Sequence, residues 1–97
     1  MVRESKVESD LLAWCKAHGV LCVKFTPMGE AGWPDRMFGY KGRVLWIELK
    51  ATGKKARPLQ QARLNQLKSY GFIAECYDNV SSAIELLEAT FFPRDRN

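Results

Sequence analysis

The sequence has few of the residues that build disulfide or zinc frameworks. Its 97 residues include one histidine, His18, and three cysteines with no C-x-x-C pair. Scattered thiols of this kind, Cys15, Cys22 and Cys76, are typical of free cysteines in a reducing cytoplasm and argue against a disulfide scaffold or a zinc site. Because a chain this short builds only a small core without such staples, self-association is a reasonable expectation from size alone.

Long apolar runs are also missing. No stretch approaches the roughly 20 apolar residues of a membrane-spanning helix, and the first ten residues, MVRESKVESD, are too polar for a signal peptide. We therefore expect a cytoplasmic protein without a membrane partner.

The composition supports one globular domain over residues 1–97. Hydrophobic residues make up 46% of the chain, and 15 Lys and Arg against 11 Asp and Glu give a formal charge of +4. A modest positive charge suits a polyanionic partner such as DNA but is shared by many unrelated small proteins.

Hydrophobic periodicity predicts seven elements, in the order α-β-β-β-α-β-α. The expected helices cover residues 3–18, 58–70 and about 80–91, and the expected strands cover 20–25, 35–40, 43–50 and 72–77. Residues 35–50 form a hairpin around a Lys-Gly turn at 41–42. This order predicts an α/β or α+β fold with a small mixed central sheet flanked by helices.

The second hairpin strand carries the main chemical signal. Side chains alternate along a strand, so Glu48 and Lys50 emerge on one face, and the hairpin brings Asp35 towards Glu48. Two carboxylates and the backbone carbonyl of Leu49 offer an oxygen site suited to Mg²⁺ or Mn²⁺. Lys50 beside them could activate water or neutralise a phosphate, as metal-assisted phosphodiester hydrolysis requires.

A surface ion pair is the simpler interpretation of Glu-x-Lys on a strand, because such pairs are common. The Gly-Trp-Pro-Asp turn at hairpin distance upstream favours the site. Helical projection adds two inward polar residues, Glu8 on the first helix and Gln60 on the second, whereas Glu4 lies near the helix start and Gln61 projects outward. An inward Gln60 could equally serve buried backbone groups.

Several basic residues are candidates for DNA contact. Lys54, Lys55 and Arg57 follow the Glu48 strand in a glycine-containing loop, where they could clamp a phosphate backbone or remain a solvated loop. Lys24 flanks the first strand. Arg63 projects near Gln60, where a phosphate contact or a snorkelling side chain is expected.

Three motifs in order, G-W-P-D-R at 32–36, I-E-L-K at 47–50 and R-P-L-Q at 57–60, resemble the VRR-Nuc family of virus-type replication-repair nucleases, within the PD-(D/E)xK superfamily. The resemblance implies a restriction-endonuclease-like αβββαβ core. It also implies that Asp35 and Glu48 bind Mg²⁺ or Mn²⁺ and that Lys50 is the catalytic lysine. Glu8 matches the first-helix acid that helps to bind metal or position water, and Gln60 matches the family's glutamine.

The resemblance implies a small standalone nuclease of the phage and bacterial type, acting in a bacterial or phage-infected cell. Such proteins cut structured DNA, with Holliday-junction or flap activities among those suggested, and they pair as homodimers. The alternative is a catalytically silent, nuclease-like module that binds DNA without metal. The preferred DNA structure is left open.

Overall fold

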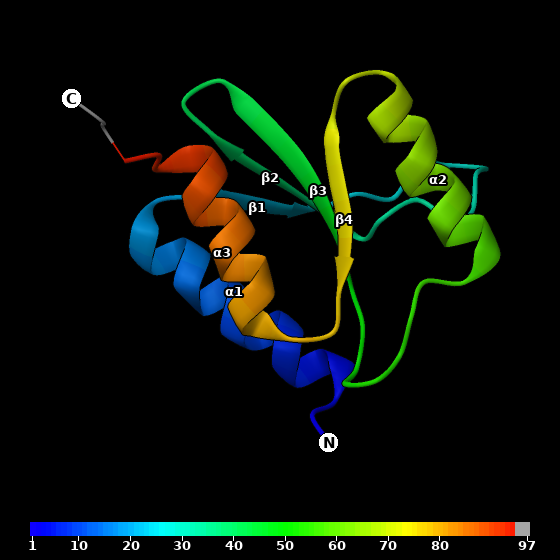
Figure 1. The fold of residues 1–97 in the computed structure, drawn as a ribbon, viewed down its shortest axis with the longest axis horizontal. Coiled ribbons are helices and arrows are strands. Elements are labelled where there is room, and N and C mark those ends of the chain that lie inside the picture. Colours follow the sequence, from blue (N-terminus) through cyan, green and yellow to red (C-terminus); the bar gives the residue numbers. More distant parts are fainter. Residues whose placement is uncertain (95–97) are drawn as a thin grey trace.

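The computed structural model describes residues 1–94, which form three helices and one four-stranded sheet (Figure 1). The predicted element order is confirmed, and each predicted bound differs from the observed one by at most one residue. The elements are α1 (Glu4–His18), β1 (Leu21–Lys24), β2 (Arg36–Tyr40), β3 (Arg43–Leu49), α2 (Pro58–Ser69), β4 (Ile73–Tyr77) and α3 (Val80–Phe91).

The sheet is mixed, with the strand order β1-β2-β3-β4. The β1–β2 and β2–β3 pairs are antiparallel, and β3 and β4 are parallel. In Figure 1, α1 and α3 lie together on one side of the sheet and α2 lies apart from them, beside β4. The crossover from β3 to β4 through α2 is the connection that a parallel pair requires. The α+β fold predicted from the sequence is therefore confirmed.

Local signals in the sequence account for where these elements begin and end. Gly19 ends α1 with φ 70°, a left-handed conformation that glycine adopts at little cost. The Lys41-Gly42 turn has positive φ at both residues, as a tight hairpin needs. Asn79 caps α3, since its side-chain oxygen accepts a hydrogen bond from the Ser82 N–H at 2.8 Å.

The sheet separates two unequal cores. The larger lies on the α1 and α3 side and contains Leu11, Phe38, Leu45, Ile47 and Leu87, each fully buried. The smaller lies under α2. It is made by Trp46, Leu64, Leu67 and Ala74, with Phe25, Trp33, Met37, Ala56 and Cys76 packed against it. Alternation along β3 therefore points its odd-numbered residues at the larger core, and this places Glu48 on the α2 side.

None of the three helices that the structure describes has the length and apolar character needed to span a bilayer.

Candidate active site

The hairpin register places the two predicted metal-binding acids opposite each other. Arg36 pairs with Ile47 and Met37 with Trp46 in the antiparallel β2–β3 ladder. One further step along this register brings Asp35, which is exposed, opposite the buried Glu48. Side chains directly opposite in an antiparallel pair have Cβ atoms about 5 Å apart. The predicted approach of Asp35 and Glu48 across the hairpin is therefore what the structure shows.

Glu48 is a buried carboxylate with an incomplete set of partners. The residue is only 1% exposed. Its Oε2 accepts a hydrogen bond from Gln60 Nε2 at 3.3 Å and lies 3.5 Å from Lys50 Nζ. Its Oε1 is buried and finds no hydrogen-bond partner within residues 1–94. A buried carboxylate oxygen without a donor is costly, so this atom is suited to receive a cation.

The electrostatics of the pair follow from this burial. Desolvation, and then the charge of Asp35, raise the pKa of Glu48 from its ordinary 4.5 to about 7, while the Lys50 ammonium opposes the rise. The Asp35 backbone N–H also faces the carboxylate and slightly lowers this pKa, although it makes no hydrogen bond of ordinary geometry with it. Near neutral pH, Glu48 therefore takes up a proton easily, and a bound cation would displace that proton.

Gln60 is the inward glutamine of α2, as predicted, and its amide is held at both ends. The Nε2 group donates to Glu48, and Oε1 accepts a hydrogen bond from the Arg57 N–H at 2.9 Å. Gln61 is exposed and donates to Asn65 at 3.0 Å. One side chain therefore contacts both the first turn of α2 and the buried acid, and the site role of Gln60 stays a prediction.

Glu8 is not brought to the other site residues. It is half-buried on α1, where it accepts a hydrogen bond from Arg36 Nε at 3.2 Å. Arg36 is 8% exposed and lies on the face of β2 that carries Phe38, on the side of the sheet away from Glu48. An inward acid needs a partner or a metal, and here the partner is this arginine. The sequence offered a signal for it, because strand alternation turns Arg36 towards α1.

The carboxylates present form a pair and not a larger cluster. Within residues 1–94, no group of three or more His, Cys, Asp or Glu side chains is placed to hold a metal ion. A cation at Glu48 and Asp35 would therefore depend on a backbone carbonyl and water for its remaining ligands. Leu49 is the last residue of β3, so its carbonyl, the third predicted ligand, lies at the same end of the sheet.

The basic loop after Lys50 is anchored on both sides. The Thr52 N–H donates to the Val2 carbonyl at 2.9 Å, and the Val2 N–H donates to Thr52 Oγ1 at 3.0 Å. Asp78 accepts the Gly53 N–H at 2.8 Å. Asp78 follows β4 and carries no signal in the sequence that would predict this contact. The anchored loop presents Lys54, Lys55 and Arg57 as exposed residues. None of them is among the ion pairs found within residues 1–94.

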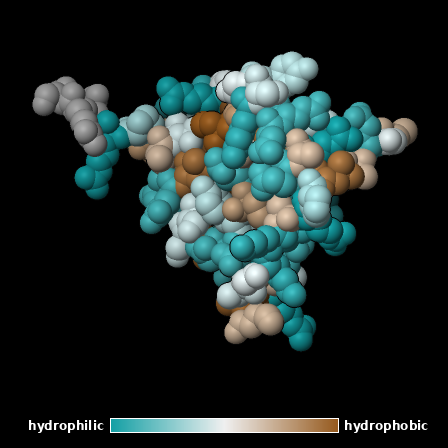
Figure 2. Space-filling view, turned by 45° about the vertical axis from the view of Figure 1, so that its right-hand side comes forward, coloured by the Kyte–Doolittle hydropathy of each residue, from teal (hydrophilic) through white to brown (hydrophobic). Residues whose placement is uncertain are grey.

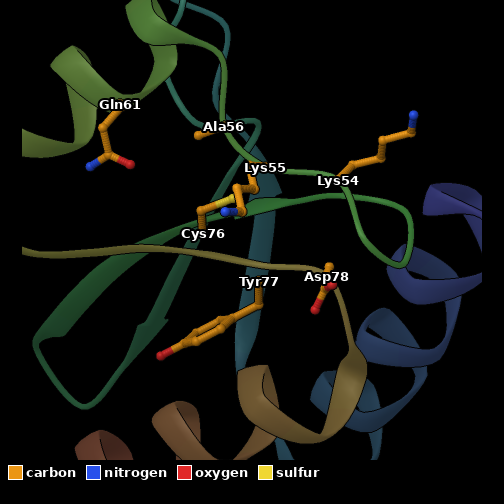
Figure 3. Close-up of a pocket in the computed structure, with 7 residues that line it drawn as sticks. All are labelled: Lys54, Lys55, Ala56, Gln61, Cys76, Tyr77 and Asp78. Carbon is orange, nitrogen blue, oxygen red and sulfur yellow. The ribbon is translucent and has the colours of Figure 1, made fainter.

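A cavity of about 410 Å³ lies between this loop, the start of α2 and the end of β4 (Figure 3). Lys54, Lys55, Ala56, Gln61, Cys76, Tyr77 and Asp78 line it, and Figure 3 shows Lys54 pointing away from the others. Cys76 is the register partner of Glu48 in the parallel β3–β4 pair. Adjacent strands lie about 4.8 Å apart, so the cavity directly adjoins the buried carboxylate.

Lys24 and Arg63 occupy different surroundings. Lys24 is exposed at the end of β1, paired with Arg36, and alternation puts it on the side of the sheet away from Glu48. Arg63 is bound to the loop that precedes Asp35, with its Nε donating to the Ala31 carbonyl at 3.0 Å. The DNA contacts expected of these two residues remain predictions.

On the face shown in Figure 2, hydrophilic residues cover most of the area and hydrophobic ones form small separate groups.

With this geometry in place, the fold can be compared with known proteins. The chain is similar to a solved "VRR_NUC domain" (TM-score 0.82, 20% identity), a match that covers 94% of this chain and 100% of the other. It is also similar to a solved "VRR_NUC domain protein" (TM-score 0.78, 22% identity), covering 99% of this chain and 93% of the other. No protein-family model matches the chain.

A relative is found by sequence as well. Over 61 residues the chain is 33% identical to "Putative nuclease p44" of Acyrthosiphon pisum secondary endosymbiont phage 1. The match covers 62% of this chain and 66% of that protein, so the chain spans just under two thirds of this relative.

The fold and the carboxylate pair define a small α+β protein with an acidic site at the end of a mixed sheet. Its fold is that of VRR_NUC domains, and the predicted resemblance to the VRR-Nuc family is confirmed.

Proposed function

We propose that the protein is a metal-dependent endonuclease that hydrolyses phosphodiester bonds in structured DNA. The observation that carries the proposal is Glu48, a buried carboxylate with an unpartnered oxygen, placed opposite Asp35 and beside Lys50. The nuclease name of the phage relative and the VRR_NUC fold support the same activity.

The donor set fits a hard divalent cation. Asp35, Glu48 and the Leu49 carbonyl provide only oxygen, the ligand type that Mg²⁺ and Mn²⁺ prefer. The unpartnered Glu48 Oε1 is the atom that most needs such a cation. When bound, the ion would act as a Lewis acid and stabilise the charge that develops on the phosphate.

The protein side chains have separate roles in this proposal. Lys50 Nζ, 3.5 Å from Glu48 Oε2, orients the attacking water or neutralises a phosphate oxygen. Gln60 fixes the rotamer of Glu48 from the other side. Glu8 acts on the site through Arg36, the residue after Asp35.

Basic residues around the site would guide the DNA backbone. The exposed Lys54, Lys55 and Arg57 lie next to the cavity that adjoins Glu48. A DNA strand bound at Glu48 would therefore pass over this cavity. Phosphate contacts of this kind give affinity and register without reading sequence. Lys24 would contact a more distant phosphate. We also propose a homodimer, which sedimentation at tens of micromolar protein would test; a monomer would refute it.

Cleavage of a panel of DNA substrates tests the activity. Purified protein is incubated with junction, flap, single-stranded and duplex DNA, with Mn²⁺ or Mg²⁺ or with EDTA. We expect metal-dependent cutting of at least one branched substrate and a loss of about 100-fold or more in Lys50→Ala. Lys68→Ala is the matched control, because Lys68 also pairs with an acid, Glu75, but lies on α2 away from Glu48. Absence of cutting, or equal cutting by Lys50→Ala, contradicts the proposal.

The alternative is a silent DNA-binding module. Calorimetric titration of the DNA-free protein with metal distinguishes this module from the enzyme. An active site predicts Mn²⁺ binding that Asp35→Ala abolishes, whereas a silent module predicts DNA binding with no metal binding in either protein. The approach of Asp35 and Glu48, two of the three matching acids, across one hairpin favours the enzyme.

A further inference from the structure

The guanidinium of Arg63 holds the segment that leads into Asp35. Its Nε donates to the Ala31 carbonyl at 3.0 Å, and its NH2 lies 3.7 Å from Glu30 Oε1. Its central carbon stands 4.5 Å from the centre of the Trp33 ring, a cation–π distance. One side chain of α2 thus contacts three residues of the loop at 25–35.

A close backbone contact strengthens this attachment. Gly32 has φ 86°, and a Cβ atom at this position would lie 2.5 Å from Leu59 Cγ and 3.3 Å from the Leu59 backbone carbon. Only glycine therefore allows the loop to approach the first turn of α2 this closely. The sequence motif that includes Gly32 and Trp33 is accounted for by docking on α2.

The docked loop leads directly to the acid. Trp33 packs edge-on against Phe25 with ring centres 6.1 Å apart, and the Phe25 N–H donates to the Asp35 carbonyl at 2.7 Å. Pro34, between Trp33 and Asp35 in the sequence, is fully buried. Because the Asp35 side chain is exposed, its position depends on this backbone. Meanwhile α2 also carries Gln60, which holds Glu48.

We propose that Arg63 is a positioning residue, which docks the 25–35 loop on α2 and so fixes the Asp35 carboxylate opposite Glu48. The inference rests on the proposed function, because the metal site is part of that function. The placement of Asp35 can nevertheless be measured in the metal-free protein. A phosphate contact is the competing role for Arg63. It fits poorly, because this side chain is 22% exposed and a further nitrogen donates to Gln66 at 3.2 Å.

The first experiment measures Mn²⁺ affinity without DNA and DNA affinity in EDTA. For Arg63→Ala we expect Mn²⁺ binding to weaken by about 10-fold or more, with DNA affinity within about 2-fold and an unchanged salt dependence. Arg63→Lys should behave like Arg63→Ala, because a lysine lacks the planar fork and stacking face. Lys68→Ala, which removes a positive charge from the same helix away from Glu48, is the control. Unchanged Mn²⁺ affinity with weaker, less salt-dependent DNA binding would assign Arg63 to phosphate contact and overturn the inference.

Gly32→Ala keeps every charge and disrupts the same docking, so it provides a second variant. It should reproduce the loss of Mn²⁺ affinity, with circular dichroism confirming that both variants remain folded. If both are folded and bind Mn²⁺ like the wild type, Arg63 does not position Asp35.

The second experiment needs neither metal nor cleavage. At a pH above the Glu48 pKa of about 7, Asp35→Asn removes a like charge opposite Glu48 and should raise the melting temperature of the metal-free protein by about 4 °C. In an Arg63→Ala background this gain should fall to less than half, because Asp35 no longer stands opposite Glu48. An equal gain in both backgrounds overturns the positioning role. Failure of the proposed function would appear separately, as absent cutting and metal binding in the wild type.

Discussion

Gln60 donates a hydrogen bond from Nε2 to Oε2 of Glu48 at 3.3 Å, while its Oε1 accepts from the Arg57 N–H at 2.9 Å. The two contacts fix which end of the amide faces the acid. This residue therefore couples the first turn of α2 to the orientation of the buried carboxylate.

Replacing Gln60 with glutamate separates these two contacts. Gln60→Glu keeps an oxygen for the Arg57 N–H but removes the donor to Glu48 and adds a third negative charge. We expect a fall in cleavage rate of about 10-fold or more, with helix content unchanged by circular dichroism. Asn65→Asp adds the same charge at an exposed position of α2 outside the cavity and is the control. Equal activity of wild type and Gln60→Glu would remove Gln60 from the site.

The raised pKa of Glu48 predicts how stability changes with pH. Because the folded-state pKa, about 7, exceeds the ordinary 4.5, the folded protein holds this proton more tightly than the unfolded chain. The carboxyl therefore favours folding below about pH 4.5, and this contribution is lost as the pH rises through 7. The full loss is on the order of 3 kcal/mol.

Thermal melts of the metal-free protein between pH 5 and about 8 measure this effect. The melting temperature of the wild type should fall relative to that of Glu48→Gln, which has no proton to lose and should be the more stable protein at the alkaline end. Added Mn²⁺ should narrow the difference by stabilising only the wild type. Parallel pH profiles for the two proteins would contradict the raised pKa.

Cys76 offers a chemical probe of the cavity beside the site. The residue is half-buried in the cavity wall, and desolvation and the nearby Glu48 charge raise the pKa of its thiol, so labelling requires alkaline pH. We expect bound DNA, in EDTA, to slow labelling of Cys76 by a maleimide several-fold. Lys55→Glu should weaken DNA binding and remove this protection.

Cys22 is the control for the labelling experiment, because it lies on β1 against the larger core. Its labelling rate should not respond to DNA. Absence of protection at Cys76 would contradict the proposed path of DNA over the cavity.

Glu8 should matter more for activity than for stability. Its side chain is 36% exposed, so the ion pair with Arg36 is screened by solvent and contributes about 1 kcal/mol or less. We expect Glu8→Gln to lower the cleavage rate by about 10-fold or more and to shift the melting temperature by only a few degrees. Lys6→Gln breaks a comparable α1 ion pair, with Asp10, and should leave cleavage unchanged. Full activity of Glu8→Gln would assign Glu8 to α1 packing alone.

The parts of the site that the sequence predicted are those that depend on local periodicity. Alternation along one strand determined that Glu48 and Lys50 share a face, and a two-residue turn fixed the register that brings Asp35 opposite. Helical projection likewise separated Gln60 from Gln61. These arguments need only the geometry of one hairpin or one helix.

The parts that were not predicted depend on contacts between distant segments. Projection turned Glu8 inward but did not identify its partner, because the ion pair with Arg36 crosses from α1 to β2. The hydrogen bond from Arg63 to the Ala31 carbonyl requires the loop before Asp35 to fold back on α2. No periodic pattern in the sequence describes that loop. Side chains at such junctions are set by tertiary packing, and a single sequence does not show it.

The unequal cores on the two faces of the sheet have a consequence for how the molecule unfolds. Glu48, Gln60 and the docked loop lie on the side of the sheet that carries the smaller core under α2, whereas α1 and α3 close the larger core. Segments with less buried apolar area open at lower free energy than the global transition. The α2 side should therefore exchange its amide hydrogens first and lose its metal-binding geometry on mild heating, while the α1–α3 half remains native.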